Sequence, residues 1–269
     1  RPPFGPAELT SDYKRILTRY YSAANWQLSG AVTLITGLHY FDVETTGMAW
    51  EAPADEVAGV TSPYIGLAWS VTDSTNVYAS YSDIFQPQSE QDINREFIGS
   101  AKGENYEIGV KQEMFDGGLL GSLALYKAEL NNYSEWDGSD DETGFSWYRG
   151  ANIETQGLEV DFTGRAGDYV TLQAGYSYMD LVNADSGDER TYLPEHTVTL
   201  LGSADVPALP GLSLGASLRW QSEIHYTSGN TDTEVKQTAY ALIGLNASYE
   251  INNQFTVALN LDNVTDENY

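Results

Sequence analysis

The sequence predicts an all-β protein built as an antiparallel up-and-down meander of about twelve long strands, part of a transmembrane β-barrel. Short turns alternate with long polar connections along the whole chain. The tight turns lie around Ser29, Ser74, Gly117, Gly167, Leu209 and Asn253. The long connections lie near residues 46–58, 87–103, 135–145, 184–194 and 226–236. Short turns at one end and long loops at the other are typical of outer-membrane barrels.

Between these turns, side chains alternate between apolar and polar with the period of two that a β-strand requires. The predicted strands are 15–28, 31–45, 60–71, 76–86, 104–115, 119–134, 146–165, 169–183, 195–206, 212–225, 237–250 and 254–264. Most are longer than the five or six residues usual in a soluble sheet, and a strand needs about 9–11 residues to cross a bilayer.

The tight turns carry the expected residues, such as Thr72–Thr75, Asp116–Gly118 and Ala166–Asp168. In the sixth strand the alternation is irregular around Tyr126–Glu129, where a β-bulge is predicted. The seventh sets Leu158 and Val160 against acidic neighbours. The alternation there separates an apolar face from a polar one.

The later strands alternate most clearly. In the eighth, Leu172 shares an apolar face with its even-numbered neighbours. In the tenth, Leu214 and Leu218 share one face and Arg219 lies on the other, and in the twelfth Val257 falls on the apolar face. The ninth and eleventh are bounded by long loops and tight turns. We expect the apolar face to contact lipid and the polar face to line the barrel lumen.

Composition excludes several other classes of protein. The chain has no cysteine, so it has neither a disulfide framework nor a Cys-ligated metal. A net charge of −26 argues against nucleic acid as a partner. No apolar run approaches the ~18–20 residues of a membrane-spanning helix. The opening Arg1–Pro3 is not a signal peptide, and strand parity predicts further strands before Arg1 and one after Tyr269.

Several segments resemble TonB-dependent ferric-siderophore receptors, and most closely the branch for hydroxamate-type and pyoverdine-type siderophores. The matching segments are Val77–Gln88, Glu104–Lys111, Gly157–Asp161, Ala174–Tyr178, Leu193–Val198, Leu218–Ser222 and Asn260–Tyr269. The resemblance implies that residues 1–269 are one domain, a C-terminal portion of a 22-stranded barrel. The plug domain, the first nine strands and the last strand are then outside this sequence.

The resemblance also implies a function and a set of partners. The complete protein is expected to be a receptor in the Gram-negative outer membrane that takes up a ferric siderophore and is energised by TonB. Outer-membrane lipid and lipopolysaccharide would surround it. No covalent cofactor and no enzymatic activity are expected, and this portion alone would not transport. A passive porin-type channel and a soluble β-sheet scaffold or adhesive protein are the alternatives.

Candidate ligand contacts are the aromatic residues near the long-loop ends, because flat rings and a few hydrogen-bond donors suit a large, partly apolar chelate. These are Trp50, Phe85, Trp136, Trp147, Tyr148, Tyr192 and Tyr226, with Arg149, Arg190 and His225 as polar contacts. The alternative role for these rings is an aromatic girdle or packing between loops. Acidic outer loops would repel a strongly anionic tris-catecholate, so hydroxamate or mixed chelators are predicted.

Other motifs give weaker evidence of a function. Gly211–Gly215 matches the nucleophile-elbow pattern, but it opens an alternating strand instead of joining a strand to a helix. The three histidines, His39, His196 and His225, do not have the spacing of a metal site. Asp137–Glu142 has the carboxylates of a calcium loop without the full EF-hand pattern, and a solvated loop is the better interpretation.

Overall fold

A computed structural model describes residues 11–50, 52–53, 56–187, 189–228 and 233–269. These residues form strands, turns and loops. None of their segments is a helix long and apolar enough to cross a membrane. Parts of the predicted long loops, at 51, 54–55, 188 and 229–232, lie outside the described residues, as do residues 1–10.

Most of the chain is one antiparallel sheet in which neighbours in sequence are neighbours in space. Its first strands are β1 (Ser11–Gln27), β2 (Val32–Ala49), β3 (Ala52–Pro53), β4 (Glu56–Ser70), β5 (Thr75–Gln86), β6 (Ala101–Met114), β7 (Leu119–Ser139) and β8 (Ser146–Ala166). It continues with β9 (Val170–Asn183), β10 (His196–Asp205), β11 (Leu212–Gln221), β14 (Tyr240–Asn252) and β15 (Phe255–Leu261). A separate two-stranded sheet holds β12 (Ile224–Ser228) and β13 (Thr233–Gln237).

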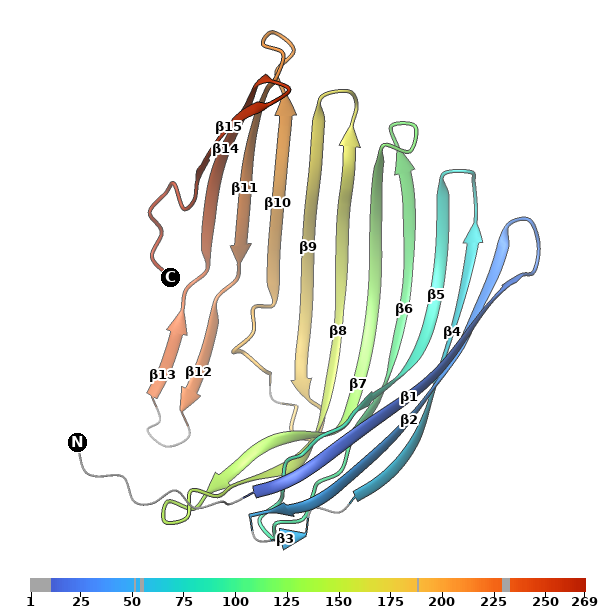
Figure 1. Ribbon diagram of the computed structural model, residues 1–269, viewed down its shortest axis with the longest axis vertical. Coiled ribbons are helices and arrows are strands. Elements are labelled where there is room, and N and C mark those ends of the chain that lie inside the picture. Colours follow the sequence, from blue (N-terminus) through green and yellow to red (C-terminus); the bar gives the residue numbers. More distant parts are fainter. Residues whose placement is uncertain (1–10, 51, 54–55, 188, 229–232) are drawn as a thin grey trace.

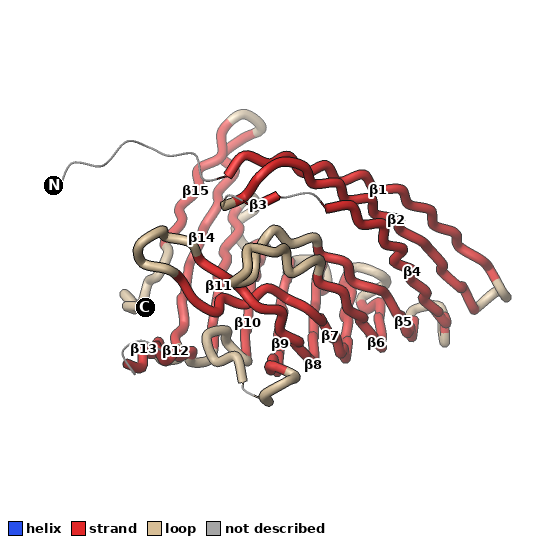
Figure 2. Tube along the Cα trace, turned by 90° about the horizontal axis from the view of Figure 1, so that it is seen from below, coloured by secondary structure: helices blue, strands red, loops and turns tan. Residues whose placement is uncertain are grey.

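The sheet is strongly curved, and its connections are sorted by length. In Figure 1 the short turns lie at the top and the long connections at the bottom. Seen from the long-loop end, the strands follow an arc, with β1, β2 and β4 on one side and β5 to β11 on the other (Figure 2). Within the described strands, β1 and β15 are the two edges of the sheet. The meander order agrees with the sequence prediction, but the predicted long loop 46–58 is shorter in the structure, because β2 runs to Ala49 and β4 begins at Glu56.

Each of the twelve predicted strands has a counterpart, but the predicted long loop 135–145 is wrong. β7 runs to Ser139 and β8 begins at Ser146, so only the short connection 140–145 joins them. The Asp140 carboxylate caps that connection by accepting the N–H groups of Glu142 and Thr143, at 2.8 and 3.3 Å. These bonds lower the pKa of Asp140 below its usual value. The ladder continues through the aromatic cross-strand pair of Trp136 and Tyr148, in a segment whose polarity predicted a loop.

The predicted strand 212–225 and the predicted loop 226–236 are also wrong in detail. β11 ends at Gln221, and the chain then forms the β12–β13 hairpin. The hairpin carries an ion pair between Lys236 Nζ and Glu223 Oε1 at 2.7 Å. It is attached to the loop after β9, because His225 N donates to the carbonyl of Thr191 at 2.9 Å. The polar residues after β11 therefore form a separate hairpin beyond the long-loop end of the main sheet.

The predicted bulge lies farther along β7 than Tyr126–Glu129, which pair regularly with β6 and β8. The register shifts between Leu130 and Tyr133, and again between Trp136 and Gly138. Asn132 lies in the first shift with a φ of 60°. Asparagine tolerates this left-handed conformation better than most residues, because its side chain can bond locally. Its amide Nδ2 donates to Ile98 O at 2.7 Å.

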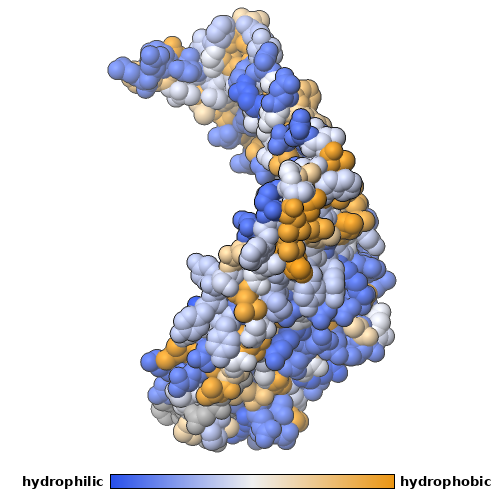
Figure 3. Space-filling view, turned by 90° about the vertical axis from the view of Figure 1, so that its right-hand side faces the viewer, coloured by the Kyte–Doolittle hydropathy of each residue, from blue (hydrophilic) through white to orange (hydrophobic). Residues whose placement is uncertain are grey.

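The register separates an apolar face from a polar face across neighbouring strands. Leu200, Leu218 and Ile243 are direct cross-strand partners on the apolar face. Gly215, Asn246 and Asn260 form a corresponding row on the polar face. The apolar face is not sealed beneath a second layer of chain: Leu214, Val257 and Leu259 are 48%, 58% and 57% exposed. Figure 3 shows hydrophobic residues gathered at mid-height on one side of the molecule.

Tyrosine rings of the polar face lie directly over glycines of the neighbouring strand. The pairs are Tyr64 with Gly37, Tyr78 with Gly109, and Tyr126 with Gly157. A Cβ atom built on Gly109 would be 2.6 Å from Cζ of Tyr78 and 2.7 Å from Leu123 O. The glycines therefore leave the space that the rings occupy, and the rings cover the glycine backbone.

We predict that Gly109→Ala destabilises the folded sheet by about 1–3 kcal/mol, because the added methyl group overlaps a ring and a backbone carbonyl. The matched control is Gly202→Ala, whose Cβ would meet its nearest neighbours, Thr171 O and Leu172 Cδ1, at 3.9 and 4.0 Å. Urea unfolding in detergent or lipid measures both variants. Equal midpoints for the two would contradict the packing described here.

Candidate functional site

Charged and polar side chains cross the apolar face near the long-loop end. Leu125, Leu158 and Tyr178 form one row of cross-strand partners, and Lys127, Gln156 and Asp180 form the next row toward the loops. Lys127 Nζ pairs with Glu129 and Glu154, at 3.1 and 3.2 Å. This change marks the outer limit of the apolar surface.

β7 and β8 continue well beyond that limit. From Gln156 back to Ser146, β8 extends roughly 33 Å at about 3.3 Å per residue. Arg149 of β8 is the direct cross-strand partner of Glu135 of β7. The extended ladder therefore carries both side chains above the apolar surface, to the level of the long loops.

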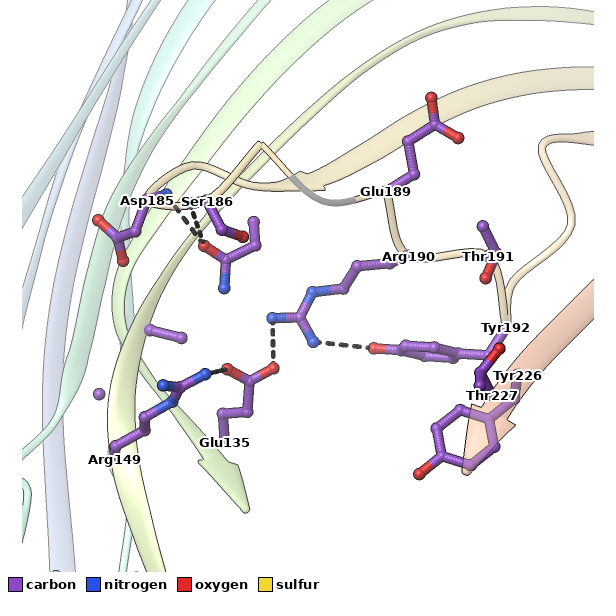
Figure 4. A pocket seen from close by; sticks show the side chains of 13 residues that line it. Glu135, Arg149, Asp185, Ser186, Glu189, Arg190, Thr191, Tyr192, Tyr226 and Thr227 are labelled. Carbon is purple, nitrogen blue, oxygen red and sulfur yellow. Dashed lines mark hydrogen bonds and ion pairs between the residues drawn. The ribbon is translucent and has the colours of Figure 1, made fainter. Parts of the chain in front are cut away.

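A cavity of about 810 Å³ lies between this β7–β8 extension, the loop after β9 and the β12 hairpin strand (Figure 4). It is lined by Glu135, Arg149, Gly150, Ala151, Asn183, Asp185, Ser186, Glu189, Arg190, Thr191, Tyr192, Tyr226 and Thr227. The volume falls within the range of about 300–1,000 Å³ typical of small-molecule sites. We call this space the outer pocket.

Arg190 is the buried cation of the outer pocket, with its side chain 10% exposed. Its Nη1 donates to the Tyr192 hydroxyl at 3.2 Å, and its Nη2 lies 2.9 Å from Glu135 Oε1. That second contact is a close ion pair without the geometry of a hydrogen bond. Burial would lower the pKa of Arg190, but Tyr192 and Glu135 outweigh it and raise the pKa, so the guanidinium stays charged.

Glu135 serves two arginines. Its Oε2 accepts a hydrogen bond from Arg149 Nη2 at 3.2 Å, while its Oε1 faces Arg190. Arg149 is 61% exposed and also lies 3.8 Å from Asp137 through Nε. Solvent therefore screens the ion pair of the exposed Arg149. The charge of the buried Arg190 is balanced by a carboxylate that it shares with Arg149.

Backbone contacts hold the loop after β9 in place. Asn183 Oδ1 accepts the N–H groups of Asp185 and Ser186, at 2.9 and 3.1 Å. Arg190 N donates to Leu181 O at 2.9 Å, and Thr191 Oγ1 donates to His225 O at 2.8 Å. The loop is therefore anchored at both ends of the pocket lining.

A second cluster, the aromatic tip, lies at the end of β8. Phe145 is 5% exposed and packs between Trp50 and Trp147, with ring centroids at 5.4 and 6.3 Å. The guanidinium of Arg95 lies over the Phe145 ring at 5.4 Å and donates to Trp50 O at 2.7 Å. These contacts pack β2, the loop after β5 and the β7–β8 turn together.

Two buried glutamines attach the loop after β5 to the same structure. Gln88 is 5% exposed, and its Nε2 donates to Gly99 O at 3.0 Å and to Asn132 O at 2.7 Å. Its Oε1 accepts the N–H of Ser134 at 2.7 Å. Gln91, 4% exposed, donates to Arg95 O at 2.8 Å. The amides replace strand pairing where the ladder ends.

The predicted ligand contacts fall into separate groups in the structure, and only some of them line the outer pocket. Arg149, Arg190, Tyr192 and Tyr226 line the outer pocket. Trp50 and Trp147 belong to the aromatic tip, and Phe85 packs against Phe41 at 4.9 Å. Trp136 and Tyr148 are direct cross-strand partners, one position from Glu135 and Arg149, so strand alternation turns them to the opposite face. His225 contributes its backbone to the contact with Thr191.

Sequence reasoning missed Glu135, Gln88 and Gln91 as site residues. Glu135 could have been predicted, because it adjoins the candidate Trp136 and because the two candidate arginines, Arg149 and Arg190, require a carboxylate partner. Nothing in the alternation pointed to the glutamines, because their importance comes from where their amides end up in space. Within the described ranges, no group of three or more His, Cys, Asp or Glu side chains is arranged to hold a metal ion.

Comparisons with known proteins agree along the whole chain. The family described as TonB dependent receptor-like, beta-barrel matches residues 2–264. The ferripyoverdine receptor of Pseudomonas aeruginosa is 30% identical over 100% of this chain and 34% of that protein. The ferrioxamine B receptor of Salmonella typhimurium is 30% identical over 71% of this chain and 28% of that protein.

Solved structures give the same result. The crystal structure of the outer-membrane ferripyoverdine receptor of P. aeruginosa bound to ferripyoverdine aligns with a TM-score of 0.84 and 30% identity, over 96% of this chain and 35% of that one. The alcaligin outer-membrane receptor of Bordetella pertussis aligns with a TM-score of 0.76 and 26% identity, over 94% and 43%. The chain spans about a third of the length of the curated relatives it matches.

We predict that Gln88→Glu loosens the loop after β5. A carboxylate oxygen in place of Nε2 would face two carbonyl oxygens, and leaving buried groups unsatisfied costs about 1–3 kcal/mol. Limited trypsin digestion should therefore cut faster after Arg95. Gln86→Glu, at an exposed position two residues earlier, is the matched control. If both variants resist trypsin as the unaltered protein does, the glutamine does not hold the loop.

Proposed function

Because the chain belongs to the family of TonB-dependent receptor β-barrels, we propose that it forms part of the wall and outer loops of a ferric-siderophore uptake receptor. The barrel lies in the outer membrane, where the relatives of this family are found. The observation that carries the proposal is the similarity to the ferripyoverdine receptor over the full length of the chain, in sequence and in fold.

The outer pocket supports this function. It lies in the long-loop layer, where an external ligand arrives first, and its volume of about 810 Å³ can accommodate part of a large chelate. Tyr192 and Tyr226, 45% and 56% exposed, offer ring surfaces, while Arg190 offers donors. The candidate residues Trp50, Phe85, Trp136, Trp147 and Tyr148 then support or flank the ligand-binding loops.

Net charge supports a choice among chelators. With −26 on the chain and acidic long loops, a tris-catecholate complex of high negative charge is repelled on approach. The relatives named for ferripyoverdine and ferrioxamine B fit the same choice. We infer that the ligand is a hydroxamate or mixed-type ferric siderophore.

The mechanism is binding followed by release, with no covalent step. The outer pocket would hold the complex at the cell surface, and TonB would energise its release into the periplasm. Outer-membrane lipid would cover the apolar face, while the polar row of Lys127, Gln156 and Asp180 would meet the lipopolysaccharide headgroups. These partners follow from the family and from the two faces of the sheet.

Uptake of radioactive iron tests the proposal. Deleting the gene of the complete receptor should abolish uptake of the cognate ferric hydroxamate or mixed siderophore under iron limitation, and deleting tonB should have the same effect. A ferric tris-catecholate complex is the comparison ligand and should not compete. Uptake that persists without TonB, or entry of unrelated small solutes through the protein, would contradict the proposal and indicate a passive channel.

A further inference from the structure

The guanidinium of Arg190 has more donors than this protein satisfies. A guanidinium carries five N–H donors. One of them is used by the Tyr192 hydroxyl, and Nη2 contacts Glu135 as an ion pair. The Nε atom makes no hydrogen bond with any described residue. The Nε and Nη2 atoms are covered, while the side chain as a whole is 10% exposed and lines the outer pocket, so a ligand acceptor that displaces a covering group can complete this set.

Arg190 shares its carboxylate partner with a second arginine of the outer pocket. Glu135 is the carboxylate in contact with Arg190, and Arg149 shares it. The Asp185 carboxylate is occupied by the backbone N–H and the side-chain amide of Asn152, at 3.2 and 2.9 Å. In Figure 4 the Glu189 carboxylate points away from Arg190. Arg149 also lies 3.8 Å from Asp137, so within the described residues it is Arg190 whose carboxylate contact is shared without a second one.

Arg190 is also well placed to hold a ligand. It reaches the pocket from the loop after β9, and its bond to Tyr192 orients that ring beside Tyr226 in the lining (Figure 4). A planar guanidinium recognises a carboxylate through parallel hydrogen bonds, which adds direction as well as strength. An anionic oxygen group that takes the place of Glu135 beside Arg190 would thus meet a guanidinium that is already oriented.

We propose that Arg190 anchors a carboxylate carried by the ferric siderophore, an assignment that rests on the proposed uptake function. The acidic loops and this anchor act at different ranges. At long range, the acidic loops repel a ligand that carries many negative charges. At contact distance, the buried arginine stabilises a single carboxylate. The ligand class is therefore a ferric hydroxamate or mixed chelate of low net charge with one free carboxylate.

A matched pair of ligands tests the assignment on the complete receptor purified in detergent. The probes are a linear ferric trihydroxamate ending in a free carboxylate and the same chelate ending in a primary amide. The unaltered receptor should bind the carboxylate form at least about tenfold more tightly, the strength of a charge-assisted contact. In Arg190→Gln this ratio should fall to about one, with amide-form affinity changed far less.

Two further variants separate ligand contact from a structural role. Glu135→Gln removes the competing carboxylate while keeping its shape, and should increase the preference for the carboxylate chelate. Arg165→Gln, at the opposite end of β8 near Asp168, is the matched control and should leave the ratio unchanged. The heat-dependent gel mobility of a folded barrel checks each variant.

An unchanged ratio in Arg190→Gln, or a decreased preference in Glu135→Gln, would overturn the assignment of Arg190 while leaving the uptake function standing. If Arg190→Gln does not fold, the Glu135→Gln ratio decides. If the unaltered receptor binds both chelates equally, Arg190 is not the anchor. If it binds neither chelate, the proposed ligand class fails and the assignment fails with it.

Discussion

The unbroken antiparallel ladder is the constraint on which the rest of the structure depends. Along the main path of the sheet, each strand between the edge strands β1 and β15 is hydrogen-bonded on both sides. In hydrocarbon, backbone N–H and C=O groups have no water to bind, so such pairing is obligatory. Pairing also fixes the register. A shift of one residue would turn Leu218 to the polar face and Arg219 to the apolar face.

The same ladder produces the site. β7 and β8 remain paired for many residues beyond the row of Lys127 and Gln156, which brings Glu135 opposite Arg149 above the membrane surface. Side chains take over from strand pairing at the margins of this extension, where Gln88 binds three backbone groups and Asn132 occupies a bulge. A binding pocket between loops can then be held by a framework of strands.

The strands, their faces and the order of short and long connections could be predicted from sequence, because each depends on local alternation and turn residues. The extent of β7 and the β12–β13 hairpin could not. Segments 135–139 and 224–237 are mostly polar. A polar strand outside the membrane lacks the alternation of apolar and polar residues by which a strand is predicted. The site was half predicted: Arg149 and Arg190 both contact Glu135, while Trp136 and Tyr148 lie on the opposite face, because each is one residue from Glu135 or Arg149 in an alternating strand.

Spin labels at single cysteines test the central claim most directly, and the absence of native cysteine in this chain favours the method. Labels at Leu214, Leu218 and Leu259 are compared with labels at Ser213, Arg219 and Asn260 in the receptor reconstituted in lipid bilayers. Our account predicts that relaxation by oxygen, which concentrates in the membrane, is strong at the first three positions and weak at the other three. Equal relaxation by a water-soluble agent at all six positions would contradict a membrane-facing apolar surface.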